Sequence, residues 1–251
     1  DSGDFAGEGL IELFQHGTPK QAERAAELLG TIKRIPSTAM PDIIRMTRGA
    51  EGNKRMQKDL LKIIGRFGAP DAKGYETIRE LRRSDLDGEN LQSFALAALS
   101  PDEKTWRHHF NILKARHKQY SSSELVSMIG WLKGHDRERS RFLSQAVEQA
   151  FRGELGRQAK NNLRNIVHAV TGFQDSVAME FYRNLLVRLA KPTPEKDEWI
   201  STSEHVLKNL LAYYPDRISE FEPLVEALPF KAKQTPVYRT FRERLKAAKT
   251  K

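Results

Sequence analysis

Three histidines that lie close together in the sequence are the first candidates for metal or acid–base chemistry. His108, His109 and His117 fall within one predicted helix, where separations of eight or nine residues bring two imidazoles to related faces. A zinc site would need another histidine or a carboxylate one helical turn away. Glu103 lies five residues before His108, which is a poor helical register for a shared ligand. We therefore predict no metal site and assign these histidines to the surface or to contacts between helices.

Other side chains that support catalysis are present, but their patterns do not favour it. Glu138, Glu148, Glu154 and Glu180 lack the apolar surroundings that raise a carboxyl pKa for general acid catalysis. The serines at 121–123 are typical of a helix cap and not of a nucleophile beside a base. The chain has no cysteine, which excludes disulfides and thiolate chemistry. We expect a protein that is not an enzyme and that uses no cofactor.

Lysine and arginine give the strongest indication of function. The chain has 42 Lys and Arg against 33 Asp and Glu, a net charge of +9, and the excess grows toward the C-terminus. Four groups of cations recur at separations of three, four or seven residues, so each group lies along one side of a predicted helix. We call them stripes 55–66, 104–118, 157–168 and 239–249. The predicted partner-binding residues are, stripe by stripe, Arg55, Lys58, Lys62 and Arg66; Lys104, Arg107, Lys114 and Lys118, with Asn111 between them; Arg157, Lys160 and Arg164, continued by His168; and Arg239, Arg242 and Lys246, continued by Lys249.

Such stripes suit an anionic partner. If alternate helices share a face, the stripes align into a positive track that contacts either an acidic protein or peptide, or the phosphates of a nucleic acid. No aromatic residues alternate with the cations, as base stacking would require, so we favour a protein or peptide and keep nucleic acid as the alternative. A simpler interpretation is that the cations only cover the solvent-facing sides of helices.

The rest of the sequence predicts the helices that position these stripes. A short apolar phrase occurs six times at intervals of 32 to 43 residues, centred on Leu29, Ile64, Leu96, Ile129, Val167 and Leu210. Such intervals are typical of helical repeats. The predicted helices cover residues 5–16, 19–33, 38–48, 54–67, 71–84, 88–99, 101–117, 122–133, 136–152, 155–171, 174–190, 196–213, 216–228 and 235–248. Strand patterns are absent, and no run of eighteen apolar residues predicts a membrane span.

Capping residues and prolines predict where these helices begin and end. The segments 18–21 (Thr-Pro-Lys-Gln) and 100–103 (Ser-Pro-Asp-Glu) each have the pattern of a capping box. Left-handed helix ends are predicted at Gly49, Gly68, Gly134, Gly153 and Gly172. Two prolines within a charged segment predict a connector at 191–198, which separates a repeat array at 1–190 from C-terminal helices at 199–251.

One stretch, residues 60–83, resembles a HEAT-type repeat, in which an apolar helix leads through a glycine–proline turn to a leucine-bearing partner helix. The residues that carry the resemblance are Leu60, Leu61, Ile63, Ile64, Gly68, Pro70, Asp71, Ile78, Leu81 and Arg82. The resemblance implies an all-α fold, a right-handed α-solenoid of about six to seven HEAT-like helix pairs. It also implies a scaffold that docks a protein or peptide along a concave, partly basic surface.

One enzymatic alternative has the same architecture. Bacterial glycosylases that excise alkylated bases from DNA are built on HEAT-like repeats of similar length and positive charge. Their activity uses a tryptophan-lined cleft with an Asp and an Arg, and no residues of this sequence match those motifs. Trp106, Trp131 and Trp199 are spread over apolar helix faces and are predicted to pack in the core. The cysteine-free composition is compatible with an exported bacterial protein and with an intracellular one.

Overall fold

The structure is a computed structural model that describes residues 2–29, 35, 37–82, 85–120, 123–152, 166–167, 176–191 and 197–249. Within these residues the secondary structure consists of fourteen α-helices and two short 3-10 helices, with no strand. This result confirms the predicted all-α class. The helix predicted at 155–171 lies almost entirely outside the described residues.

The chain divides into two units. Unit 1 comprises residues 1–120 and 131–133, and unit 2 comprises residues 121–130 and 134–251. The helices on either side of the connector predicted at 191–198, α11 (Ser176–Leu189) and α12 (Asp197–Tyr213), both belong to unit 2. Most of that connector lies outside the described residues.

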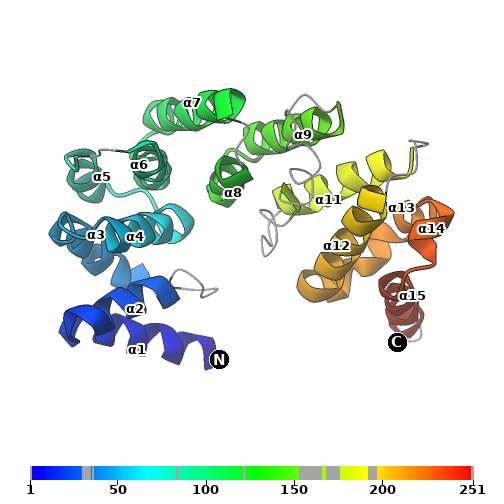
Figure 1. Cartoon of the computed structure of the whole chain (residues 1–251), viewed down its shortest axis with the longest axis horizontal. Helices are drawn as coiled ribbons and strands as arrows, with labels where there is room; N and C mark the ends of the chain where they lie inside the picture. Colours follow the sequence, from blue (N-terminus) through cyan, green and yellow to red (C-terminus); the bar gives the residue numbers. More distant parts are fainter. Residues whose placement is uncertain are drawn as a thin grey trace. The chain divides into compact units, whose positions relative to one another are not determined.

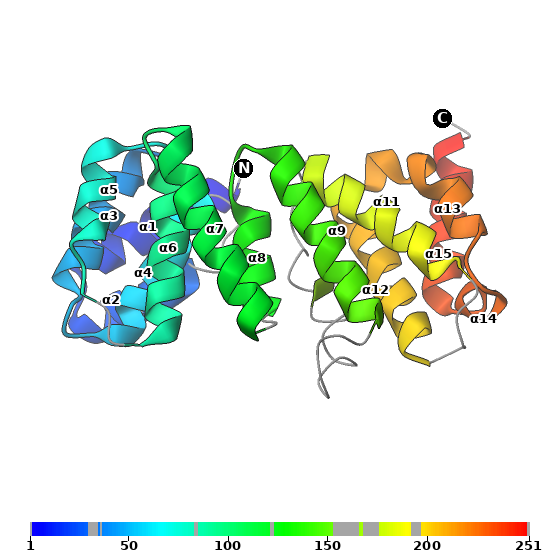
Figure 2. The ribbon, with the colours of Figure 1, turned by 90° about the horizontal axis from the view of Figure 1, so that it is seen from above.

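Unit 1 contains helices that pack in pairs. Helix α1 packs on α2, α3 on α4, and α5 on α6, while α7 packs on α6. The second helices α2, α4 and α6 also pack on one another in sequence order, and α3 packs on α5 (Figure 1). Figure 2 shows α6 and α7 side by side. The bounds are α1 Ser2–His16, α2 Pro19–Leu29, η1 Ser37–Ala39, α3 Met40–Gly49, α4 Lys54–Phe67, α5 Ala72–Arg79, α6 Leu86–Leu99 and α7 Glu103–Tyr120.

Helix α4 shows why the sequence forms these pairs. Its apolar residues recur every three or four positions, and Leu60, Ile63 and Ile64 are fully buried. Burying each such side chain contributes about 1.5–3 kcal/mol. Gly65 lies on the same helix, and the ring of Phe94 on α6 packs directly against its backbone, because a Cβ there would lie 2.2 Å from a ring carbon. The glycine thus sets the close approach of α4 and α6.

One predicted capping box is confirmed and the other is wrong. At α2 the Thr18 amide donates to Gln21 Oε1 at 2.8 Å, and the Gln21 amide donates back to Thr18 Oγ1 at 3.4 Å. At α7 the cap is Asp102, which accepts from the Thr105 amide at 2.8 Å. Ser100 instead donates its hydroxyl to Leu96 O at 2.8 Å, so it completes the end of α6 and does not begin α7.

The predicted glycine ends are also partly wrong. Gly49 is the last residue of α3 and Gly68 follows α4, but neither has a positive φ, and the φ of Gly68 is −58°, so neither helix end is left-handed. Gly134 does adopt a positive φ of +73°, three residues after the end of helix α8 (Ser123–Trp131). Gly153 and Gly172 lie outside the described residues.

Unit 2 is built around α12. Helix α9 packs on α11 and α11 on α12, and α12 also contacts η3, α14 and α15 (Figure 2). Phe181, Tyr182, Phe221 and Phe241 are buried in this unit. The remaining bounds are α8 Ser123–Trp131, of which Trp131 belongs to unit 1, α9 Asp136–Arg152, η3 Pro215–Phe221, α13 Glu222–Glu226, α14 Phe230–Lys233 and α15 Pro236–Lys249.

The single helix predicted at 216–228 is in fact two elements. The 3-10 helix η3 is followed by the short helix α13, which has Pro223 in its first turn. Proline has no backbone N–H and cannot donate to the preceding turn, so a continuous α-helix through residue 223 would lose a hydrogen bond there. The sequence prediction missed this break.

Candidate binding surface

Stripe 55–66 lies on α4 and makes contacts with neighbouring segments of unit 1. Arg55 pairs with Glu27 of α2 at 3.5 Å. The guanidinium carbon of Arg66 lies 4.2 Å from the ring centroid of Trp131, and burial lowers the pKa of Arg66. Lys58, Lys62 and Arg66 are half-buried, because α4 packs between α2 and α6. Three of the four cations of this stripe are therefore less accessible to a partner than a solvent-facing stripe would be.

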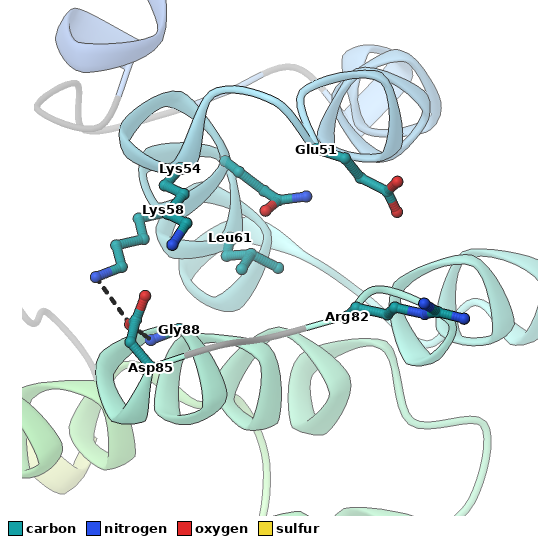
Figure 3. A pocket seen from close by; sticks show the side chains of 8 residues that line it. Glu51, Lys54, Lys58, Leu61, Arg82, Asp85 and Gly88 are labelled. Carbon is teal, nitrogen blue, oxygen red and sulfur yellow. Dashed lines mark hydrogen bonds and ion pairs between the residues drawn. The ribbon is translucent and has the colours of Figure 1, made fainter.

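A hollow of about 260 Å³ lies between α4 and the start of α6 (Figure 3). Lys54, Lys58 and Arg82 line it together with Glu51 and Asp85. The Lys58 ammonium points toward Asp85, and its Nζ lies 3.0 Å from Asp85 Oδ1. This hydrogen bond raises the pKa of Lys58. The pKa of the Asp85 carboxyl is lowered by the backbone N–H of Gly88 and by Lys58. Lys58 and Asp85 therefore join α4 to the cap of α6, which is a structural role.

Stripe 239–249 lies on α15 and stripe 157–168 cannot be placed. Arg242 is half-buried and pairs with Glu226 at 2.5 Å and with Glu222 at 3.4 Å. Arg239 and Lys246 are exposed. The residues of stripe 157–168, Arg157, Lys160, Arg164 and His168, lie outside the described residues, as does the side chain of Lys249.

Stripe 104–118 lies on α7, and the opposite side of this helix is well anchored. Trp106 and Phe110 are buried and stack with ring centroids 4.8 Å apart. His109 is buried as well, and its Nε2 lies 3.0 Å from Tyr75 Oη on α5. Burial and the neighbouring His108 lower the pKa of His109 to about 4, so its imidazole is neutral at neutral pH. Arg116 pairs with Glu89 of α6 at 2.7 Å.

The histidines of α7 thus divide between its two sides. His109 and His117 are buried, whereas His108 is exposed. Across the part of the chain that the structure describes, no three His, Asp or Glu side chains are grouped so that they could hold a metal ion. The hydrogen bond between Tyr75 and His109 was missed at the sequence level, because the two residues belong to different helices and have no local signal in common.

The exposed side of α7 presents its cations to solvent. Lys104, Arg107, Lys114 and Lys118 are all exposed and fall within an arc of about 80° when α7 is drawn at about 100° per residue. Arg107 pairs with Glu103 one turn earlier, at 2.6 Å. The three lysines form no ion pair with any described residue of the chain.

The neighbouring helices differ from α7 in this respect. On α3, Arg45 pairs with Asp42 of the same helix at 2.5 Å. On α5, Arg79 pairs with Glu76, again within one turn. These two arginines are therefore compensated by acids of their own helices. We now call the cations of stripe 104–118 the α7 basic face. Among the described residues, Arg107 of this face pairs with Glu103 and Lys104 lies near Asp102, whereas Lys114 and Lys118 form no ion pair.

Comparison of the chain with protein-family models, curated proteins and solved structures gives no match. None of the described helices combines the length and the apolar character that a bilayer crossing requires. The candidate site therefore follows from the geometry of α7 alone.

Proposed function

We propose that this protein is a non-enzymatic binding scaffold of the α-solenoid type, which binds an acidic protein or peptide through the α7 basic face. The arrangement of unit 1 supports the architectural part of this proposal. Its helices form the successive pairs α1–α2, α3–α4 and α5–α6, and the second helices of these pairs pack on one another. Stacked pairs of this kind are the building principle of HEAT-like solenoids, which bind partners along extended surfaces.

The observation that carries the functional part is the exposure of Lys114 and Lys118 without an ion pair among the described residues, together with Lys104, which is exposed on the same side of α7 near Asp102. An exposed ion pair contributes only about 0.2–1 kcal/mol, so a single lysine is a weak binding element. Several uncompensated cations on one side of one helix attract an acidic surface together and increase its association rate. The buried contacts of Trp106 and Phe110 hold the helix in place, so the face is organised before the partner arrives.

This proposal assigns the surface to α7 and not to a track that joins several stripes. The cations of α4 already contact Glu27, Asp85 and Trp131 within unit 1. Stacking on nucleic acid bases would favour aromatic side chains beside the cations. The arc of α7 that carries its cations has no aromatic residue. These features favour an acidic protein or peptide over a nucleic acid.

Fluorescence anisotropy tests the proposal with two labelled probes, an acidic peptide of about twenty residues, as long as α7, and a duplex DNA of similar length. We expect the peptide to bind, its affinity to fall as salt is added, and the variant Lys114→Glu/Lys118→Glu to bind about tenfold more weakly at low salt. Tighter binding of the duplex than of the peptide would contradict the choice of partner. Peptide affinity that is unchanged in the variant would contradict the choice of surface.

A further inference from the structure

The cations of the α7 basic face follow a regular spacing. Lys104, Arg107, Asn111, Lys114 and Lys118 are separated by three, four, three and four residues, and all five are exposed. The mean separation of about 3.5 residues is close to one helical turn, so the five side chains stay in a narrow line along α7 and do not wind around it. At about 1.5 Å per residue this line is roughly 21 Å long.

A second α-helix is the element whose side chains match such a line. Two helices that lie side by side meet along positions that alternate between separations of three and four residues. Glu or Asp at that spacing would place one carboxylate opposite each position of the line. An extended acidic chain advances about 6.6 Å for every second residue, so its carboxylates fall out of step by about 5 Å over the same length.

The surroundings of the line leave room for this approach. Ala115 is exposed next to it, so the helix carries only a methyl group at that position. Arg107 and the lysines have long aliphatic stems that can lie along a neighbouring helix while their charged ends reach its carboxylates. The central position, Asn111, is uncharged and offers an amide, which carries both donors and an acceptor.

We propose that the element bound by the α7 basic face is an acidic α-helix whose Glu or Asp residues follow the same three-four spacing. This inference rests on the proposed function and makes it more specific. It predicts that the arrangement of acids on the partner matters, and not only their number.

Two labelled peptides of identical composition test this inference on the full chain. In the first, Glu recurs at alternating separations of three and four residues, and in the second the same Glu residues are distributed around the helix. Circular dichroism is used to match the helicity of the two peptides. We expect the first peptide to bind at least about fivefold more tightly than the second, because two or three ion pairs with the α7 basic face are lost in the second.

A matched pair of variants adds a second readout. Asn111→Lys adds a cation in the middle of the line and is expected to increase the affinity for the first peptide by about threefold. Gln119→Lys adds the same charge to an exposed position of α7 beside the line and is expected to increase the affinity for the first peptide less than Asn111→Lys does. Equal affinities of the two peptides would overturn the helical inference and leave the proposed function standing. Failure of both peptides to bind would overturn both.

Discussion

The phenol of Tyr75 on α5 and the imidazole of His109 on α7 share a hydrogen bond of 3.0 Å. Their ring centroids lie 5.7 Å apart, and His109 Nδ1 is buried without a hydrogen-bond partner among the described residues. The bond joins α7 to the preceding helix pair on the side opposite its exposed cations. It therefore helps to hold the α7 basic face in position.

Removal of the Tyr75 hydroxyl is expected to destabilise the protein. Tyr75→Phe leaves the buried Nε2 of His109 without its partner, which costs about 1–2 kcal/mol in the free energy of unfolding. Urea denaturation followed by circular dichroism measures the change. Tyr120→Phe is the control, since Tyr120 is 50% exposed and the loss of its hydroxyl should change stability by less than about 0.5 kcal/mol. Equal stabilities of the two variants would show that the bond contributes nothing.

The lowered pKa of His109 predicts a dependence of stability on pH. The folded protein holds this imidazole neutral with a pKa of about 4, whereas the unfolded chain titrates near the ordinary value of 6.5. The unfolded state therefore binds more protons between these values, and the stability present above pH 6.5 is lost as the pH falls toward 4. The loss amounts to about 3 kcal/mol. Denaturation at several pH values should show it.

Substitution of His109 separates this group from the carboxylates that also titrate at low pH. His109→Gln should have a much shallower fall in stability between pH 6.5 and 5 than the unsubstituted protein. His16→Gln, at an exposed histidine of α1, should retain the full fall. If both variants kept the same pH profile, His109 would not be the group responsible.

Gly65 is expected to tolerate no side chain. In Gly65→Ala the new methyl group would lie 2.2 Å from the ring of Phe94, so α4 and α6 must move apart, at a cost of about 1–3 kcal/mol. Gly49→Ala is the matched control, because nothing lies within 4 Å of a Cβ at this position in α3. That substitution should be neutral or stabilise the protein by up to about 1 kcal/mol. Thermal unfolding measures the stability of both variants. A higher unfolding temperature for Gly65→Ala than for Gly49→Ala would contradict the account.

Arg139 is expected to be essential for the turn between α8 and α9 in unit 2. Its side chain is only 2% exposed, and it donates at 2.8 Å to Gly130 O, Gly134 O and Asp136 Oδ1. Arg139→Ala would leave these acceptors unsatisfied and cost about 2–4 kcal/mol. Arg141→Ala removes an exposed arginine of the same helix and should change stability by less than about 0.5 kcal/mol. Similar urea midpoints for the two variants would contradict this role.

The sequence predicted those features of the fold that depend on neighbouring residues. The apolar spacing of α4 and the capping box at Thr18 are local patterns, and both are confirmed. The failure at Ser100 has a physical reason, since Ser100 and Asp102 are both good capping residues and only the packed structure decides between them. The right-handed solenoid of six to seven pairs remains a proposal.

The candidate site was harder to predict, because spacing shows that side chains share one side of a helix but not what that side meets. Lys58 and Lys114 were both predicted as partner-binding residues on the same kind of spacing. In the structure Lys58 pairs with Asp85 of a neighbouring segment, whereas Lys114 is exposed without an ion pair among the described residues. The difference arises because α4 packs between α2 and α6. No pattern within residues 54–67 reports those neighbours.

The most direct test of the central claim compares local with total charge. The variant Lys104→Glu/Lys114→Glu/Lys118→Glu reverses the α7 basic face. The control Lys20→Glu/Arg141→Glu/Lys208→Glu reverses three exposed cations on α2, α9 and α12, so the net charge of +9 falls equally in both. The account predicts that affinity for the acidic peptide falls by about tenfold or more in the first variant and by less than about threefold in the second. Equal losses in the two variants would contradict it.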